Sequence, residues 1–344
     1  MSTSLILIIV IIAVALAFDF TNGFNDSANI VATSIMARAI EPQTALLIAA
    51  VSEFTGAYFL GTAVASTIGK GIIDPSAFVG AGMTGGYAIL SAIVGAIAWN
   101  FTSWRLGVPS SSSHALIGGL VGSFCASRGF HSVHWEKVGQ VVAIMIISPM
   151  VGFTATYIFT KLTLIFSSWC TPSVNKIFRR IQVLSLITQS LAHGTNDAQK
   201  TMGVITFSLM VLGFIATPGG DISGHFDIPR WVTFICAFAI ALGMGIGGKR
   251  IIKTLGSKLY KIRPVHGFAS QIASTIIIYT ASTFGFPLST TQVITSSVMG
   301  SGAAFRLKMV RWQVAQNMVF AWFITIPSSA LVSMAVFFLI KKIF

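Results

Sequence analysis

The chain has 344 residues, of which 54% are hydrophobic and only 9% are charged. A water-soluble domain of this length needs far more charge, so the composition excludes that class and predicts an integral membrane protein. The formal net charge is +13, yet the 22 basic residues lie mainly in short loops between apolar stretches, which indicates a topological role and argues against a nucleic-acid partner.

Apolar stretches recur along the whole chain. A membrane-spanning helix needs about 20 predominantly apolar residues. Stretches that approach this length occupy residues 4–17, 44–68, 87–101, 138–166, 201–216, 231–247, 265–284 and 312–340. The first has no basic segment before it and no small-residue cleavage site, so we expect it to be retained rather than removed as a signal peptide. The chain is therefore predicted to be an all-α, multi-pass protein of the plasma (inner) membrane, in contact with the lipid bilayer.

A polar motif follows the first apolar stretch. Four of its residues recur at i, i+3, i+4 and i+7 and would share one helix face. They are Asn22, Asn25, Asp26 and Asn29. A carboxylate at bilayer depth is costly unless it is paired, so this stripe predicts an ion or substrate pathway. The alternative is that the stripe only forms hydrogen bonds between helices.

Glu53 is a lone carboxylate within the second apolar stretch. By the same reasoning we predict that it handles a proton or another cation. The alternative is a pairing with a basic residue such as Lys200 or Arg105.

Pro109 precedes four serines and an apolar run. The serines are Ser110, Ser111, Ser112 and Ser113. Proline is tolerated in the first turn of a helix and serine caps it, so the pattern predicts a helix N-terminus. Backbone N–H groups and hydroxyls converge there, a combination that binds anions. The alternative is that the serines merely let helices approach closely.

The second half of the chain repeats the landmarks of the first. The matching pairs are Asn25-Asp26 and Asn196-Asp197, Pro109 and Pro287, Trp135 and Trp312, and Pro149 and Pro327. Each is displaced by about half the chain in the same order, which indicates duplication. We predict a first transmembrane repeat over residues 1–168, a short cytoplasmic linker over 169–180 and a second, inverted repeat over 181–344. Each repeat should contain a helix broken around its Asn-Asp motif and a re-entrant hairpin.

The second copy carries its own polar stripe and its own helix start. The stripe consists of Gln189, His193, Asn196, Asp197 and Lys200. Lys200 follows Asp197 by three residues and is expected to neutralise it. Ser289, Thr290 and Thr291 follow Pro287, and they predict a second anion-binding helix N-terminus.

Basic residues mark two segments as cytoplasmic. One contains Lys176, Arg179 and Arg180, and the other spans residues 249–263. The counterpart of the second segment in the first half, residues 69–86, holds only Lys70 and Asp74, as an inverted repeat predicts. Both termini are then expected on the extracytoplasmic side.

The two kinds of motif are complementary in charge. Hydroxyl and N–H donors can hold a tetrahedral oxyanion, whereas Asp26 and Asp197 repel it until a cation neutralises them. This predicts a symporter that works by alternating access. A sulfate or other oxyanion carrier, a passive anion channel, and a membrane hydrolase using Ser113 and His114 remain alternatives. No third group orients such a pair, so we do not expect an enzyme.

Four motifs resemble those of the PiT family of inorganic phosphate transporters. They are the segments GFNDSAN at 23–29, VPSSSSH at 108–114, GTNDAQKTMG at 194–203 and PLSTTQ at 287–292. The resemblance implies phosphate uptake driven by sodium or protons, inverted repeats with re-entrant hairpins, and often a homodimer. Phe24 departs from the small residue usual before the first Asn-Asp, and Gln292 stands where the family often has histidine. The short linker lacks the large insert of animal members, which implies a prokaryotic protein.

The resemblance also assigns roles to individual residues. Phosphate contacts are implied for Ser110 to Ser113, Gln199, Ser289, Thr290 and Thr291. Cation contacts, with sodium as one candidate, are implied for Asn25, Asp26, Asn196 and Asp197, to which the residue patterns add Asn22 and Glu53. The coupling ion aside, no cofactor is expected, and Cys125, Cys170 and Cys236 are too far apart to suggest a disulfide or metal site.

Overall fold

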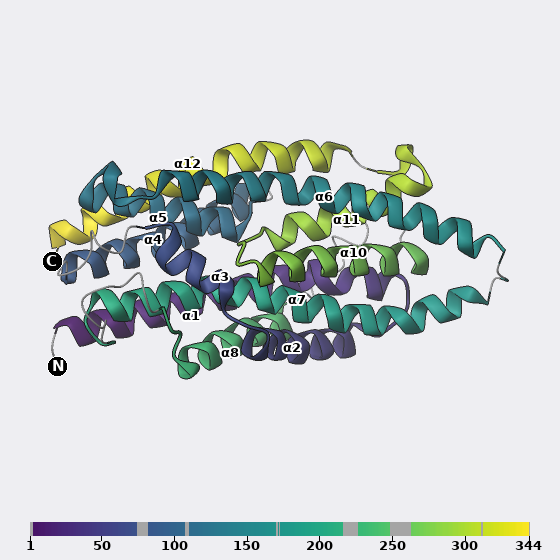
Figure 1. Ribbon diagram of the computed structural model, residues 1–344, viewed down its shortest axis with the longest axis horizontal. Helices are drawn as coiled ribbons and strands as arrows, with labels where there is room; N and C mark the ends of the chain where they lie inside the picture. Colours follow the sequence, from purple (N-terminus) through teal and green to yellow (C-terminus); the bar gives the residue numbers. More distant parts are fainter. Residues whose placement is uncertain are drawn as a thin grey trace.

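The computed structural model describes residues 3–73, 82–106, 110–169, 171, 173–215, 226–247, 263–310 and 312–343. Its helices form an elongated bundle with both chain ends at the same end of the molecule (Figure 1). Throughout these ranges no strand forms, and the only extended pairing is an isolated bridge between Ile73 and Val133. The predicted all-α class is confirmed.

The main helices of the first half recur in the second half in the same order. The first half contains α1 (Thr3–Met36), α2 (Pro42–Phe59), the short α3 (Ala63–Ser66), α4 (Met83–Leu106), α5 (Ser112–Arg128) and α6 (Trp135–Ser167). The second half contains α7 (Val174–Val211), α8 (Arg230–Ile246), α10 (Pro264–Thr283), α11 (Thr290–Phe305) and α12 (Trp312–Ile343).

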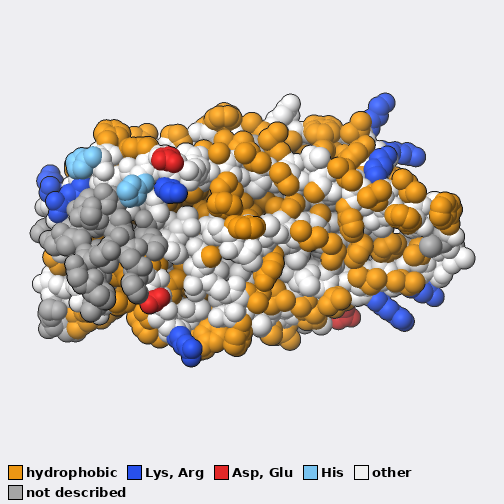
Figure 2. Space-filling model, in the orientation of Figure 1, with side chains coloured by type: hydrophobic (Ala, Val, Ile, Leu, Met, Phe, Trp, Pro, Cys, Tyr) orange, Lys and Arg blue, Asp and Glu red, His pale blue; other side chains and the backbone are white. Residues whose placement is uncertain are grey.

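Several helices are long and apolar enough to cross a bilayer. Within the described residues α1, α4, α6 and α12 qualify, and α2 with the segment after it adds a fifth span that is bent by 62°. Figure 2 shows hydrophobic side chains over much of the visible face, with most lysines and arginines toward the two ends. This distribution is the one a bilayer requires, and the chain is a multi-pass membrane protein.

The helix breaks lie in different places from those expected. α1 runs without interruption through Asn25-Asp26, and α7 through Asn196-Asp197, so the expected breaks around these motifs are wrong. Neither motif contains proline, and no backbone donor is lost there. The chain breaks instead between α2 and α3, where Gly61 has a φ of +105°, and immediately before α5 and α11. Glycine adopts this left-handed conformation without steric cost.

Helices of the two halves pack against each other in matching pairs. α2 packs on α7 and α8 on α1, while α5 packs on α12 and α11 on α6. Figure 1 shows α1 and α7 running in opposite directions along the long axis, and α6 and α12 likewise. Inverted repeats require such an arrangement. Because α7 already begins at Val174, most of the predicted linker is helix, and the repeat boundaries remain predictions.

Some predicted features lie outside the described residues. They are Pro109, Cys170, Asp74 and the basic residues between 249 and 262. The connection from α6 to α7, next to Lys176, Arg179 and Arg180, lies at the opposite end from both termini (Figure 1). A cytoplasmic connection and extracytoplasmic termini require these segments to lie at opposite ends. The orientation of the protein in the membrane itself remains a prediction.

Glycines let α1 and α8 approach closely. A Cβ atom at Gly243 would lie 2.1 Å from the carbonyl oxygen of Phe20, and one at Gly23 would lie 2.1 Å from that of Ile240. Each clash is with backbone, so only movement of a whole helix would relieve it. This contact helps to hold α1, which carries Asp26, in place.

We expect Gly243→Ala to lower the thermal stability of the detergent-solubilised protein, because over-packing costs about 1–3 kcal/mol. Gly245→Ala is the matched control, since Gly245 is exposed on the same helix and its Cβ would lie 3.6 Å from its nearest neighbour, Ala50. Thermal unfolding followed by tryptophan fluorescence measures both. Equal stability of the two variants would contradict a tight α1–α8 contact.

Candidate functional site

The first residues of α5 and α11 meet within the bundle. Ser111 caps α5, and its hydroxyl accepts a hydrogen bond from the backbone N–H of His114 at 3.4 Å. Ser289 occupies the corresponding position before α11. Ser113 Oγ donates to the backbone oxygen of Leu288 at 2.8 Å. The two predicted helix N-termini therefore exist and touch each other.

Hydroxyls at the start of α11 bond to carboxylates of both long helices. Thr291 donates to Asp26 Oδ1 at 2.5 Å, and Thr290 donates to Asp197 Oδ2 at 3.0 Å. Both aspartates are buried. The structure thus joins residues of the predicted phosphate group to residues of the predicted cation group.

The polar stripe on α1 divides into buried and exposed members. Asn22 is buried, and its Nδ2 donates to Asp197 Oδ2 at 2.8 Å while its Oδ1 accepts from Ser112 at 2.5 Å. Asn22 therefore connects α1, α5 and α7. Asn25 is exposed, because it lies at the edge of the stripe about 100° around the helix from Asp26.

Lys200 occupies the centre of the site. Its Nζ donates to Asp197 Oδ1 at 2.6 Å, to Ser113 Oγ at 2.5 Å and to the backbone oxygen of Leu288 at 2.8 Å. These contacts use all three of its N–H donors. The expectation that Lys200 neutralises Asp197 is confirmed, and the same side chain also ties α5 to the segment before α11.

His193 links three carboxylates. Its Nδ1 contacts Glu53 Oε1 in a short hydrogen bond, and its Nε2 lies 3.5 Å from both Asp26 Oδ2 and Asp197 Oδ2. All four side chains are buried. The stripe on α7 had placed His193 beside Asn196 and Asp197, but nothing in the sequence had assigned it a role.

Glu53 has a different partner from those considered. Its pairing with Lys200 or Arg105 was the structural alternative, and neither pairing forms among the described residues. Glu53 faces His193 because α2 packs on α7, where Gly194 lets the two backbones approach closely. Burial of this carboxylate beside an imidazole suits the predicted handling of a proton or cation.

Three ligand atoms converge in this cluster. Asp26, His193 and Asp197 each offer one atom, and these atoms lie within 4.8 Å of one another. Together with Glu53 the cluster holds three carboxylates, against which Lys200 is the one permanent positive charge among the described contacts. The donor set fits a small cation, and the charge balance favours one.

Two further predicted residues hold the helix starts in place. Asn196 donates from Nδ2 to Ser282 Oγ at 2.9 Å and accepts at Oδ1 from the backbone N–H of Leu288 at 3.1 Å. The hydroxyl of Ser110 lies 2.5 Å from that of Ser103 on α4. Asn196 therefore anchors the segment that precedes α11, and Ser110 connects the start of α5 to α4.

Gln199 lies at the break between α2 and α3. Its Oε1 accepts from the backbone N–H groups of Val64 at 2.8 Å and Ala65 at 3.3 Å. Its Nε2 donates to the backbone oxygen of Gly61 at 2.7 Å. The amide replaces backbone hydrogen bonds that the break removes, so in this conformation Gln199 anchors α3. Its contact with phosphate remains a prediction.

We expect Gln199→Leu to lower thermal stability even in phosphate-free buffer, because buried backbone groups left without partners cost about 1–3 kcal/mol each. Gln313→Leu, at an exposed position on α12, is the control. Thermal unfolding with and without phosphate separates the two roles. Unchanged stability without phosphate, combined with lost phosphate binding, would make Gln199 a substrate contact alone.

A further buried carboxylate extends the site along α1. Asp19 lies one turn before Asn22, and its Oδ1 accepts from Thr201 Oγ1 at 2.5 Å. The i, i+3, i+7 spacing of Asp19, Asn22 and Asp26 was the signal that could have included it in the stripe.

Fold and site together define a multi-pass membrane protein whose buried, charged site is built by two matching sets of helices. The model of the phosphate transporter family matches the chain over residues 22–170 and 166–333. The chain belongs to this family.

Relatives of similar length support this assignment. The probable low-affinity inorganic phosphate transporter of Bacillus subtilis is 43% identical over 100% of both chains. Its namesake in Rhizobium meliloti is 42% identical over 94% of this chain and 93% of its own. A solved structure named the sodium-dependent phosphate transporter is 25% identical, has a TM-score of 0.84, and covers 98% of this chain and 100% of its own. These relatives are transport proteins, and the chain is one too rather than an enzyme.

Proposed function

We propose that the protein is a secondary active transporter that imports inorganic phosphate in symport with sodium or a proton, by alternating access. One observation supports this most strongly. The N-termini of α5 and α11 meet at the buried carboxylates Asp26 and Asp197, with hydroxyl groups bonded directly to the acids. The names of the relatives support phosphate as the anion.

The same hydroxyls serve two acceptors in turn. Each hydroxyl has one O–H to donate, and in this conformation Thr290 and Thr291 donate theirs to Asp197 and Asp26. A cation bound at the aspartates weakens them as acceptors, so the hydroxyls can turn toward phosphate. The hydroxyl of Ser289 is buried and has no hydrogen-bond partner within the described residues, so it is a further donor for the anion.

Charge balance explains why anion and cation travel together. Three carboxylates already outnumber Lys200, and phosphate adds more negative charge to a region that water does not reach. Binding of phosphate alone is therefore unfavourable. A cation near Asp26, His193 and Asp197 offsets this excess of negative charge. Bound cation therefore raises the affinity of the site for phosphate, and bound phosphate raises its affinity for the cation. The two halves of the chain pack against each other around the site, and in alternating access they move relative to each other so that the site opens first to one side and then to the other.

The cluster offers a place for either coupling ion. Carboxylate and amide oxygens of Asp26, Asp197 and Asn22 are the ligands that sodium prefers. The imidazole of His193, between two aspartates, accepts a proton instead. The name of the solved relative, a sodium-dependent phosphate transporter, supports sodium, whereas the His193–Glu53 pair supports a proton. The homodimer implied by the resemblance also remains a prediction.

Transport by the purified protein in liposomes tests the proposal. Labelled phosphate or sulfate is supplied outside, with an inward sodium gradient, an inward proton gradient or neither. We expect phosphate to accumulate against its own gradient with one of the cation gradients only. Accumulation of sulfate in place of phosphate would move the assignment to a sulfate carrier, and uptake that never exceeds equilibrium would indicate a passive channel.

Loss of single hydroxyls tests the phosphate site. We expect Ser111→Ala and Thr290→Ala each to raise the phosphate concentration for half-maximal transport about tenfold, the equivalent of one hydrogen bond to a charged group. Thr290→Ser keeps the hydroxyl and should stay near the wild type. Unchanged half-saturation in both alanine variants would place the phosphate elsewhere.

A further inference from the structure

A pocket lies at the end of the bundle that is opposite to the two termini, where α6 ends and α7 begins. This pocket of about 500 Å³ opens between the end of α6 and the beginnings of α7 and α10. Leu164, Ser167, Asn175, Phe178, Arg179 and Arg263 contribute to its lining. It is separate from the central cluster, to which none of these residues belongs.

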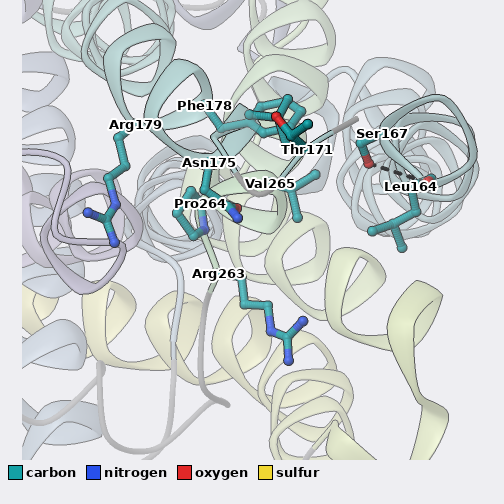
Figure 3. A pocket seen from close by; sticks show the side chains of 10 residues that line it. Leu164, Ser167, Thr171, Asn175, Phe178, Arg179, Arg263, Pro264 and Val265 are labelled. Carbon is teal, nitrogen blue, oxygen red and sulfur yellow. Dashed lines mark hydrogen bonds between the residues drawn. The ribbon is translucent and has the colours of Figure 1, made fainter. Parts of the chain in front are cut away.

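Two exposed arginines line the pocket. Figure 3 shows the side chains of Arg179 and Arg263 extending away from Phe178 and Val265, with their guanidinium groups on different sides of the view. Neither arginine is paired with a carboxylate within the described part of the chain. The guanidinium of Arg263 lies 4.8 Å from the centre of the Phe305 ring, a stacking contact that leaves its edge donors available. A guanidinium fork of this kind suits a phosphate group, and each arginine offers one.

The backbone adds positive potential from the same direction. α7 begins at Val174 and α10 begins at Pro264, and both residues line the pocket. The positive end of each helix dipole therefore lies at the pocket and favours an anion there. Lys176 and Arg180, both exposed, extend the positive charge beyond the pocket.

The pocket lies at the end of a helix that is long and apolar enough to cross a bilayer. α6 is long enough to span the bilayer and ends at Ser167, beside the pocket. Phe166 and Trp169 are exposed here, and Trp169 is 85% exposed. Exposed aromatic side chains at the end of a spanning helix mark the boundary between acyl chains and head groups. An occupant of the pocket therefore has apolar surroundings on one side and arginines on the other.

We propose that this pocket binds the phosphodiester head group of an anionic membrane phospholipid, with its acyl chains lying along Phe166 and Trp169. A free phosphate ion would use the arginines but not the apolar side, and a zwitterionic lipid would bring its own cation to compete with them. The site lies on the predicted cytoplasmic side, where anionic head groups and basic residues attract each other.

Thermal stability in lipid mixtures tests this site. The full chain in mixed micelles of detergent and phosphatidylcholine is compared with the same micelles containing phosphatidylglycerol. We expect phosphatidylglycerol to raise the melting temperature of the wild type, and the double variant Arg179→Gln/Arg263→Gln to lose most of this rise. Arg230→Gln, which removes an exposed arginine at the start of α8, should keep it. Arg179→Lys/Arg263→Lys should keep part of it, which separates loss of charge from misfolding.

Three outcomes would overturn the proposal. One is an equal rise with phosphatidylcholine alone. Another is an undiminished rise in the double glutamine variant. The third is a rise of the same size with inorganic phosphate in lipid-free detergent that also depends on the two arginines, because it would assign the pocket to a free anion.

Discussion

Asp197→Asn is expected to abolish accumulation of phosphate against its gradient. Asp197 accepts hydrogen bonds from Lys200, Asn22 and Thr290, and it lies 3.5 Å from His193. Asparagine keeps the shape and one acceptor oxygen of Asp197 but removes the negative charge. The electrostatic attraction that favours binding of the coupling cation is then lost. In liposomes with an imposed cation gradient, uptake should fall to the level of liposomes without protein.

Asp26→Asn should have the same effect, because Asp26 faces the same imidazole and accepts from Thr291. Asp227→Asn is the control, since Asp227 is exposed outside the bundle core before α8. Exchange of phosphate without a gradient shows whether a variant still binds its substrate. Full uphill transport in both Asp197→Asn and Asp26→Asn would refute the coupling role of the cluster.

Lys200→Met is expected to destabilise the protein more than any other single change in the site. The ammonium group bonds Asp197, Ser113 and the backbone of Leu288, and all of these are buried. Removing one member of a buried ion pair leaves the other charge uncompensated, which costs about 3–5 kcal/mol. Thermal unfolding and the yield of monodisperse protein in detergent measure the loss.

A double variant distinguishes this electrostatic cause from a simple loss of packing. Asp197→Asn/Lys200→Met removes both charges and should recover much of the stability that Lys200→Met loses. It should not recover gradient-driven transport. If Lys200→Met is as stable as the wild type, or if the double variant is less stable than the wild type by the full sum of the two single losses, the pair is not the structural centre of the site.

Internal repetition made much of the architecture predictable. Matching motifs around Pro109 and Pro287 predicted two helix starts, and the structure brings α5 and α11 into contact through Ser113 and Leu288. Helical periodicity predicted the shared face of Asn22 and Asp26. Both patterns are local, and local spacing is what a sequence displays directly.

Contacts between distant segments were not predictable in the same way. Glu53 and His193 are 140 residues apart, and their pairing depends on how closely α2 packs against α7. Gln199 shared a motif with Asp197, but its amide fills the break between α2 and α3. Asn25 belonged to the stripe by spacing, yet the neighbouring helices leave it exposed. Tertiary packing determines which partners these side chains meet and whether they are buried. Helical periodicity alone does not predict that packing.

The expected breaks at the Asn-Asp motifs show how a functional motif can mislead. Asparagine next to aspartate often ends a helix, because these side chains compete for backbone hydrogen bonds. Here Asn196 bonds to the hairpin before α11 and Asn22 bonds to Asp197, so partners outside the helix satisfy the side chains. α1 and α7 therefore continue as regular helices through the site.

Phosphate affinity measured at several cation concentrations tests the central claim most directly. In the wild-type protein, phosphate binding is followed by calorimetry while sodium is varied at fixed pH, and again while pH is varied without sodium. The coupled site predicts that one of the two cations tightens phosphate binding, and that phosphate tightens the binding of that cation by the same factor. Phosphate affinity that stays constant in both series would contradict it.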